Sequence, residues 1–386
     1  MSKFPPVIRR TRVEVDLGAV VDNARIVSAF VGVPLLAVVK ADGYGHGALA
    51  VARRLSQEGA AAGFGVSLVE EGVALREGGI TPPILVMGPS HRGGEDEMIA
   101  HGLTPVISDP SEVEPLIEAA RRAGKKVELH LKVDTGMGRL GVPEAEAVTT
   151  ALAARAGGLQ VTGLMTHFAN ADSDDPADNG SFTVEQLRRF AAVTEALRNA
   201  GLPLAVRHAA NSSGAMMFGV ARFDLVRCGI AIYGNGHWSS ERELPVPRRP
   251  AMRLVAEIAQ LRHVPRGQSV GYGQVWRAER DSLVAVLPIG YADGLPRRAT
   301  GHASVLIRGQ RCPLVGAISM DIALADVTEL PNVAVDDMAL LFGRGGGRDG
   351  GSITAAEYAA SCGLTEYEVT CGMSKRVPRT YVEGLW

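Results

Sequence analysis

The segment LLAVVKADGYGHG, residues 35–47, begins with an apolar run, reaches Lys40 and continues at once into a stretch rich in glycine. The run before Lys40 is typical of a buried strand, and the residues after it are typical of a turn. An amine in such a place can be partly desolvated, which lowers the pKa of a lysine from its usual value of about 10.4 and frees the lone pair to attack an aldehyde. The segment therefore indicates a Schiff-base lysine, although a strand-end lysine on its own is also typical of a side chain that simply extends to solvent.

Outward from this segment, short apolar runs alternate with helical stretches from Leu35 to Arg227, which is typical of repeated βα units and a parallel sheet. The predicted strands are 35–39, 61–66, 83–87, 104–107, 127–133, 160–166, 205–209 and 223–227. Amphipathic runs such as 111–123 and 183–199 lie between them. Eight units in about 220 residues favour a TIM (β/α)8 barrel over an open doubly wound sheet.

After Gly236 the pattern changes to short alternating runs separated by glycine, proline and charged turns, such as 255–261, 283–288, 303–307 and 338–342. This pattern predicts a mostly β domain. We expect a barrel domain over 12–237 and a β domain over 238–386, with 237–250 as the linker. The run RVEVDL, residues 12–17, alternates like a half-exposed strand. The N-terminal strand, about 1–17, is therefore a candidate to pair with the second domain.

Composition excludes several classes of protein. The net charge of −2 comes from interspersed signs, so no basic face for nucleic acid is expected. No apolar run reaches 18 residues and the N-terminus lacks the pattern of a signal peptide, which predicts a cytoplasmic protein with no membrane partner. The four cysteines form no CxxC pair and no zinc-like spacing with the histidines, so neither disulfides nor a metal site is expected.

In a TIM barrel the active site forms at the C-terminal ends of the strands, so the polar residues that follow the predicted strands are expected to converge. These residues are Lys40, Arg139, His167, Asn211, Ser212 and Arg227. Phosphate commonly binds at the loops after the last two strands, which offer the Ser212 hydroxyl and the backbone around Gly229 and Ile230. The Tyr44 hydroxyl is placed to reach the same group. Each residue alone also suits an ordinary structural role, such as a helix cap for Ser212; together they favour a pyridoxal phosphate site.

Five motifs, AVVKADGYGHG, KVDTGMGRLG, SVGYGQVW, PIGYADG and GAISMDIALADVT, resemble those of the alanine racemase family, and the resemblance extends from about residue 11 to 380. It implies a TIM barrel followed by a β domain and pyridoxal 5'-phosphate as cofactor. It also implies a homodimer in which each active site is completed by the second domain of the partner. The expected reaction is the interconversion of L- and D-alanine, which supplies D-alanine for peptidoglycan.

The resemblance also implies roles for single residues. Inversion of a chiral centre needs a base on each face. Lys40 would hold the cofactor and serve one face, and Tyr272 from the other subunit would serve the second, with His167 and Arg227 supplying positive charge beside it. Arg139, the backbone of Met320 and Tyr291 of PIGYADG would bind substrate. The residues expected to bind cofactor are Lys40, Tyr44, His167, Asn211, Ser212, Arg227, Gly229 and Ile230, and Lys132 matches a lysine that is carbamylated in many members.

Three positions depart from the family pattern. Lys375 stands where many members have tyrosine, and Ala317 and Ser319 stand where arginine and cysteine are frequent. A pocket with less aromatic wall would admit serine, because a small apolar site rejects one added hydroxyl only weakly. The alternatives are thus a serine or broad-specificity racemase of this family, a related barrel-fold decarboxylase, and a non-catalytic pyridoxal phosphate carrier.

Overall fold

The structure, a computed structural model, describes residues 8–91, 93–202, 204–236, 246–345 and 350–384. The chain divides into two compact units. One, the barrel unit, is Val20–Arg249, and the other, the β unit, combines the residues up to Ala19 with Pro250–Trp386. The predicted domain boundary at 237/238 and most of the predicted linker fall at 237–245, outside the described residues.

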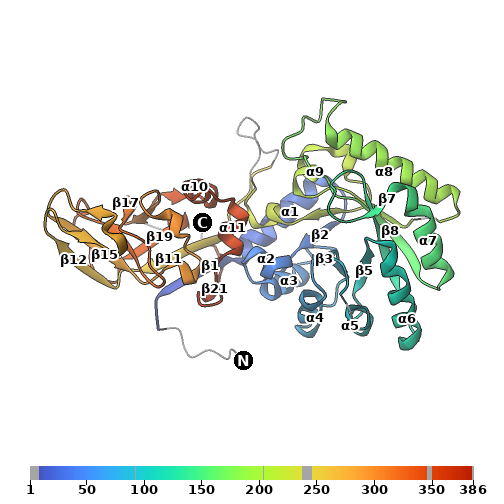
Figure 1. Cartoon of the computed structure of the whole chain (residues 1–386), viewed down its shortest axis with the longest axis horizontal. Coiled ribbons are helices and arrows are strands. Elements are labelled where there is room, and N and C mark those ends of the chain that lie inside the picture. Colours follow the sequence, from blue (N-terminus) through green and yellow to red (C-terminus); the bar gives the residue numbers. More distant parts are fainter. Residues whose placement is uncertain (1–7, 92, 203, 237–245, 346–349, 385–386) are drawn as a thin grey trace. The chain divides into compact units, whose positions relative to one another are not determined.

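The described part of the barrel unit contains a ring of eight parallel strands in the order β10-β2-β3-β4-β5-β6-β8-β9, with the short β7 added beside β6 (Figure 1). The strands are β2 (Leu35–Val38), β3 (Gly63–Val66), β4 (Ile84–Val86), β5 (Thr104–Ile107), β6 (Glu128–Asp134), β7 (Val142–Pro143), β8 (Gln160–Met165), β9 (Val206–His208) and β10 (Val226–Cys228). Two backbone hydrogen bonds, from Asp224 to Arg207 and from Arg227 to Ala210, join the β9 side to the β10 side. The ring is therefore nearly closed, and the predicted barrel is confirmed.

Helices surround this ring (Figure 1). They are α1 (Leu17–Val31), α2 (Lys40–Tyr44), α3 (Ala48–Gln57), α4 (Val69–Glu77), α5 (Gly94–Ala100), α6 (Val113–Ala123), α7 (Ala147–Ala156), α8 (Phe182–Asn199) and α9 (Ser212–Met217). The sequence of α6 shows why they pack: Val113, Leu116 and Ala120 recur at helical spacing and are all buried. The short elements α2 and α9 instead follow strands β2 and β9 at the rim, where site residues were expected.

Every predicted barrel strand is present, with ends that differ from the prediction by three residues or fewer. Strand β7 was not predicted, because two residues are too short to show an alternation. The predicted run 255–261 is not one strand: it covers the end of β11 (Met252–Glu257) and the start of β12 (Gln260–Val264). The buried Ile258 between them continues the apolar pattern through the turn, which hides the break.

The β unit is built on a ten-stranded sheet of described residues, in the order β12-β15-β18-β17-β16-β19-β11-β1-β21, with β20 beside β19. The elements not yet given are β1 (Thr11–Asp16), β13 (Ser269–Val270), β14 (Trp276–Arg277), β15 (Ser282–Leu287), β16 (Ser304–Ile307), β17 (Gln310–Val315), β18 (Ala323–Asp326), β19 (Met338–Arg344), β20 (Ser352–Ile353), α10 (Ala355–Ser361), α11 (Glu366–Cys371) and β21 (Arg379–Val382).

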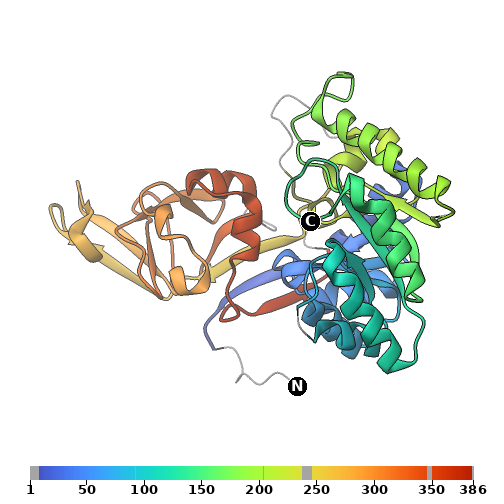
Figure 2. The same cartoon turned by 45° about the vertical axis from the view of Figure 1, so that its right-hand side comes forward.

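The N-terminal strand β1 lies in the β unit, antiparallel to β11 and parallel to β21. Figure 2 shows this arrangement, with the first strand of the chain beside the last. Its residues Val13 and Val15 are fully buried in the core of the β unit. The first and the last strand of the described residues therefore pair within one sheet.

None of the helices that the structure describes has the length and apolar character needed to cross a membrane.

Candidate active site

Lys40 follows β2 and begins a turn of unusual hand. The next four residues, Ala41, Asp42, Gly43 and Tyr44, have φ values of 53°, 53°, 63° and 53°. This is one turn of left-handed helix, which costs roughly 1–2 kcal/mol for each residue that carries a Cβ. Backbone bonds from Gly43 to Val39 and from Gly45 to Ala41 close the turn. The sequence correctly predicted a turn here, but the spacing of its glycines does not reveal the left hand, since three of the four residues carry a Cβ.

Arg227 on β10 is the buried centre of the rim, with 3% of its surface exposed. Its terminal nitrogens donate to Nδ1 of His208 at 2.9 Å and to Nδ1 of His167 at 3.1 Å. They also donate to three backbone oxygens, those of Thr166, His208 and Ala209. Burial lowers the pKa of Arg227 to about 10, so the guanidinium keeps its charge at neutral pH. Among the described residues, its Nε–H has no acceptor.

This arginine fixes the protons of three histidines. A guanidinium only donates, so Nδ1 of His208 and Nδ1 of His167 must both accept, and each ring carries its proton on Nε2. Nε2 of His208 then donates to Nδ1 of His130, 2.8 Å away. Burial, followed by the charge of Arg227, holds the pKa of His208 and His167 well below the usual value and lowers that of His130 to about 4.

His167 is therefore neutral at physiological pH, which corrects the expectation that it contributes positive charge. Burial and four nearby cations disfavour a second proton on its ring and hold its pKa low. Its Nε2–H remains a hydrogen-bond donor. Of His167 and Arg227, only Arg227 therefore carries a positive charge.

Lys132 and Arg139 belong to the same cluster. Lys132 lies in β6, two residues before the end of the strand, and has 5% of its surface exposed; burial, then the charges of Arg227 and Arg139, lowers its pKa to about 8. The charge of Lys40 also lowers the pKa of both Lys132 and His167, whereas the carboxylate of Asp134 raises the pKa of Lys132. The charges of Lys40, Arg139 and Arg227 thus all act on Lys132. The rim is a strongly cationic site.

The loops after β9 and β10 form a tight backbone corner. A Cβ on Gly229 would lie 2.3 Å from the hydroxyl oxygen of Tyr44, so a larger residue there would have to displace the Tyr44 ring. The Ser212 hydroxyl accepts a hydrogen bond from the backbone of Ala231, at 3.3 Å. The Asn211 side chain accepts from the backbone of Gly214 and caps α9, which is the ordinary structural role that the sequence suggested for Ser212. Ile230, next to Gly229, is buried.

The remaining predicted residues lie in the β unit and are exposed. Tyr272, in the turn between β13 and β14, has 72% of its surface exposed, and Met320 and Tyr291 have 51% and 45%. The loops that carry Met320 and Tyr291 are hydrogen-bonded to each other: the backbone N–H of Tyr291 donates to the carbonyl oxygen of Ser319, and that of Ala292 donates to the carbonyl oxygen of Met320.

A buried ion pair supports this pair of loops. Asp293, which is fully buried, binds both terminal nitrogens of Arg9 at 2.7 and 2.8 Å and accepts from the backbone of Gly290. Arg376 reaches Asp293 at 3.3 Å and Asp321 at 2.7 Å. Lys375 is the exposed neighbour of Arg376, and Ala317 is buried. Of the three positions that depart from the family pattern, Ala317 and Ser319 thus lie in the Met320 loop, and Lys375 is next to Arg376, which forms an ion pair with Asp321 of that loop.

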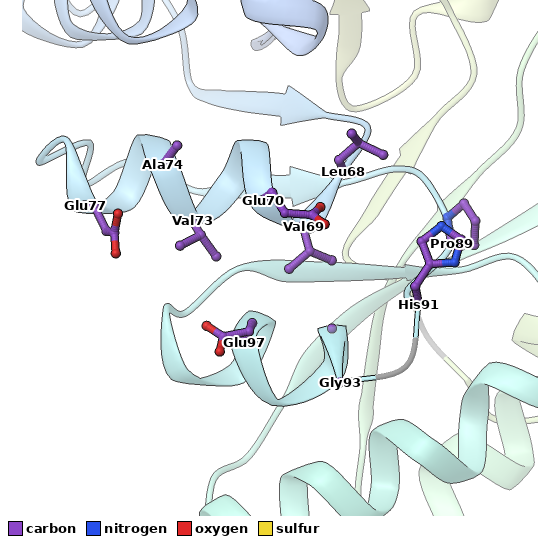
Figure 3. A pocket seen from close by; sticks show the side chains of 11 residues that line it. Leu68, Val69, Glu70, Val73, Ala74, Glu77, Pro89, His91, Gly93 and Glu97 are labelled. Atoms are coloured by element: carbon purple, nitrogen blue, oxygen red, sulfur yellow. The ribbon is translucent and has the colours of Figure 1, made fainter. Parts of the chain in front are cut away.

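A groove of about 420 Å³ lies elsewhere on the barrel unit, between α4 and α5. Figure 3 shows side chains that line it, among them the apolar Val69 and Val73 and the carboxylates of Glu70, Glu77 and Glu97. None of the site residues predicted from the sequence lines it.

Sequence reasoning missed His130 and His208, which complete the network around Arg227. The prediction took residues at the very end of each predicted strand or after it, whereas His130 lies within the predicted strand 127–133 and His208 within 205–209. A signal was present, because a polar ring inside a short buried strand needs a partner. Gly163 on the neighbouring strand leaves the space that the His130 ring fills, since a Cβ at Gly163 would lie 2.4 Å from that ring.

A nearly closed βα barrel with a cationic rim, continued in the same chain by a mostly β unit, defines a two-domain barrel enzyme. Two family models cover almost all of the chain: "Alanine racemase, N-terminal domain" matches residues 15–236 and "Alanine racemase, C-terminal domain" matches 251–381. The chain belongs to the alanine racemase family, and its enzyme class is isomerase.

Relatives agree over the full length. The alanine racemase of Sorangium cellulosum is 41% identical, and the match covers 97% of this chain and 100% of that protein. The crystal structure of alanine racemase from D-cycloserine-producing Streptomyces lavendulae superposes with a TM-score of 0.89 at 35% identity, covering 98% of both chains. That of Bartonella henselae, with covalently bound pyridoxal phosphate, gives a TM-score of 0.84 at 28% identity, covering 97% of this chain and 99% of that one. The comparisons favour an isomerase over the decarboxylase and carrier alternatives.

Proposed function

We propose that this protein interconverts L- and D-alanine with pyridoxal 5'-phosphate, by a two-base mechanism in a homodimer. The observation that carries the proposal is the cluster of Lys40, Lys132, Arg139 and Arg227 at one rim of the barrel. Cations set close together, two of them buried, attract anions. A phosphate group and an amino acid carboxylate are two such anions.

The rim fits pyridoxal phosphate in three respects. Arg227 has an Nε–H without an acceptor among the described residues, which suits the ring nitrogen of the cofactor, and its guanidinium keeps its proton rather than transferring it. His167 would hold the cofactor through its Nε2–H, since its Nδ1 already accepts from Arg227. The corner formed by Tyr44, Ser212, Gly229 and Ile230 offers hydroxyl groups and a closely approached backbone to the phosphate.

When bound, pyridoxal phosphate supplies the electron sink that makes the α-proton of an amino acid removable. Lys40 Nζ moves this proton on one face of the α-carbon, and the hydroxyl of Tyr272 of the partner subunit moves it on the other. The high exposure of Tyr272 supports this assignment, because a side chain that must enter a second subunit has to project from its own. Tyr291 and the Met320 backbone come from two loops of the β unit that are joined by backbone hydrogen bonds.

Arg139 binds the substrate carboxylate, and Lys132 steadies it as a carbamate. With a pKa of about 8, a sizeable fraction of Lys132 is the neutral amine at physiological pH. The neutral amine forms an N–C bond with carbon dioxide and releases a proton to water. The resulting anion replaces a buried cation beside Arg139 and Arg227 with an ion pair, which favours the modification.

Exchange of the α-proton tests the function. Purified protein with pyridoxal phosphate is expected to incorporate deuterium from deuterated water into L-alanine and to reduce its circular dichroism to zero, and Lys40→Ala is expected to do neither. A panel that includes L-serine measures how far Lys375, Ala317 and Ser319 widen the specificity. Retention of the optical activity of L-alanine by the loaded wild type would refute the proposal. The supply of D-alanine for peptidoglycan and a cytoplasmic location stay predictions.

A further inference from the structure

The left-handed turn after Lys40 is held by one carboxylate from the neighbouring βα unit. Glu71, in the first turn of α4, accepts a hydrogen bond from the backbone N–H of Ala41 at 2.6 Å through Oε1. Its second oxygen, Oε2, accepts from the backbone of Ser67 at 2.9 Å and of Leu68 at 3.1 Å. The single side chain therefore joins the residue after Lys40 to the end of β3.

This contact reaches the most demanding point of the backbone. Ala41 is the first residue of the left-handed turn and carries a Cβ, so its φ of 53° needs external support. Strands β2 and β3 are paired neighbours, with Val38 opposite Gly65, so a carboxylate at the start of α4 is within reach of the turn. A bond from a backbone N–H to an ionised carboxylate is among the stronger ones available.

In another βα unit, a glutamate ties down the start of its own helix but makes no hydrogen bond to a second strand end among the described residues. Glu112 accepts from the backbone of Ser108 at 2.6 Å and of Asp109 at 3.2 Å through one oxygen, as Glu71 does at Ser67 and Leu68. The backbone bonds of Glu112 stay inside its own unit. Glu71 uses its other oxygen on a different strand end, so tying down its own helix does not account for the contact with Ala41.

We propose that Glu71 is a positioning residue that holds the left-handed turn and thereby sets the place from which the Lys40 amine acts. This inference rests on the proposed function of Lys40. Because Lys40 would both hold the cofactor and move a proton, its side chain has two states, and its backbone has to stay in place while the amine moves. Glu71 keeps Ala41 fixed during both states without touching the reacting atoms.

The test compares Glu71→Gln with Glu112→Gln as the matched control. A glutamine has one acceptor oxygen and one NH2 group, so it cannot accept on both sides as the carboxylate does. Hydrogen exchange of the peptide covering 41–47, in protein without cofactor, is expected to be about tenfold faster in Glu71→Gln than in wild type and unchanged in Glu112→Gln. With pyridoxal phosphate, kcat of Glu71→Gln is expected to fall about tenfold in both directions while KM for alanine changes less than about twofold.

Rescue distinguishes positioning from general stability. Glycine adopts a positive φ at no steric cost, so Ala41→Gly in the Glu71→Gln background is expected to restore most of the lost kcat. If Glu71→Gln alone does not fold, the double variant must fold and be active. Unchanged exchange at 41–47 in Glu71→Gln, or a double variant no better than the single one, would overturn the proposal. Activity retained by Lys40→Ala would instead refute the proposed function and leave the exchange result standing.

Discussion

At the scale of single residues, Arg227 is both the most buried charge of the rim and the group with the most partners. Replacing it by glutamine leaves two histidine nitrogens and three backbone oxygens without a matching donor set. We expect Arg227→Gln to lower the free energy of unfolding by about 3 kcal/mol or more. Urea denaturation measures this, with the exposed Arg188→Gln as a control that changes it by less than about 0.5 kcal/mol. Equal effects of the two variants would contradict the network described for Arg227.

Lys132 makes stability depend on pH in a defined direction. Its pKa is about 8 in the folded protein against an ordinary value of 10.5, so between these values the unfolded chain binds more protons than the folded one. Stability therefore rises as pH rises through this window, by up to about 3 kcal/mol, and the cost of burying the charged amine applies below pH 8. Denaturation in carbonate-free buffer is expected to show this rise in wild type and to lose it in Lys132→Met. The same slope in both proteins would show that other groups cause it.

At the scale of elements, the corner after β10 depends on the absence of a side chain at Gly229. We expect Gly229→Ala to weaken pyridoxal phosphate binding at least tenfold, because the new methyl group meets the ring of Tyr44 within 3 Å. Gly219→Ala is the control, since a Cβ there meets nothing within 4 Å. Titration of both variants with the cofactor measures the difference. Equal affinity for the two would show that the corner is not part of the phosphate site.

The pairing of β1 predicts how the β unit can be separated. Strand β1 lies between β11 and β21, and Arg9 neutralises the buried Asp293. A fragment of residues 250–386 is therefore expected to lack a cooperative thermal transition, whereas the same fragment with residues 8–17 linked to it shows one. Differential scanning calorimetry of the two fragments measures this. Cooperative unfolding of the shorter fragment would mean that β1 is dispensable.

The sequence predicts this fold well wherever the pattern is local. Apolar runs bounded by turns located the barrel strands, and alternation in RVEVDL located β1. Contacts between segments that are distant in the chain could not be predicted from such local patterns. The left-handed hand of the Lys40 turn depends on Glu71, which lies in the next βα unit, and the tautomers of His130 and His208 depend on Arg227. Asn211 and Ser212 show the same limit of sequence-based prediction. The two polar residues are adjacent, yet Asn211 accepts from the backbone of Gly214 and caps α9, whereas Ser212 accepts from the backbone of Ala231.

At the scale of the whole molecule, the two units contribute different parts of the proposed chemistry. The barrel unit holds Lys40 and the cationic rim, and the β unit carries the exposed Tyr272. Neither unit alone has a base for each face of the substrate. We propose that a complete site takes its two bases from two different subunits.

Mixing two inactive variants tests this claim most directly. Lys40→Ala and Tyr272→Phe are each expected to lack racemase activity. In a mixed dimer, the intact Lys40 of one subunit meets the intact Tyr272 of the other, so one site in two is complete. After subunit exchange at equal concentrations, about half of the dimers are mixed, and we expect about a quarter of the wild-type activity to return. Activity of the mixture no greater than the sum of the two separate variants would contradict the shared site.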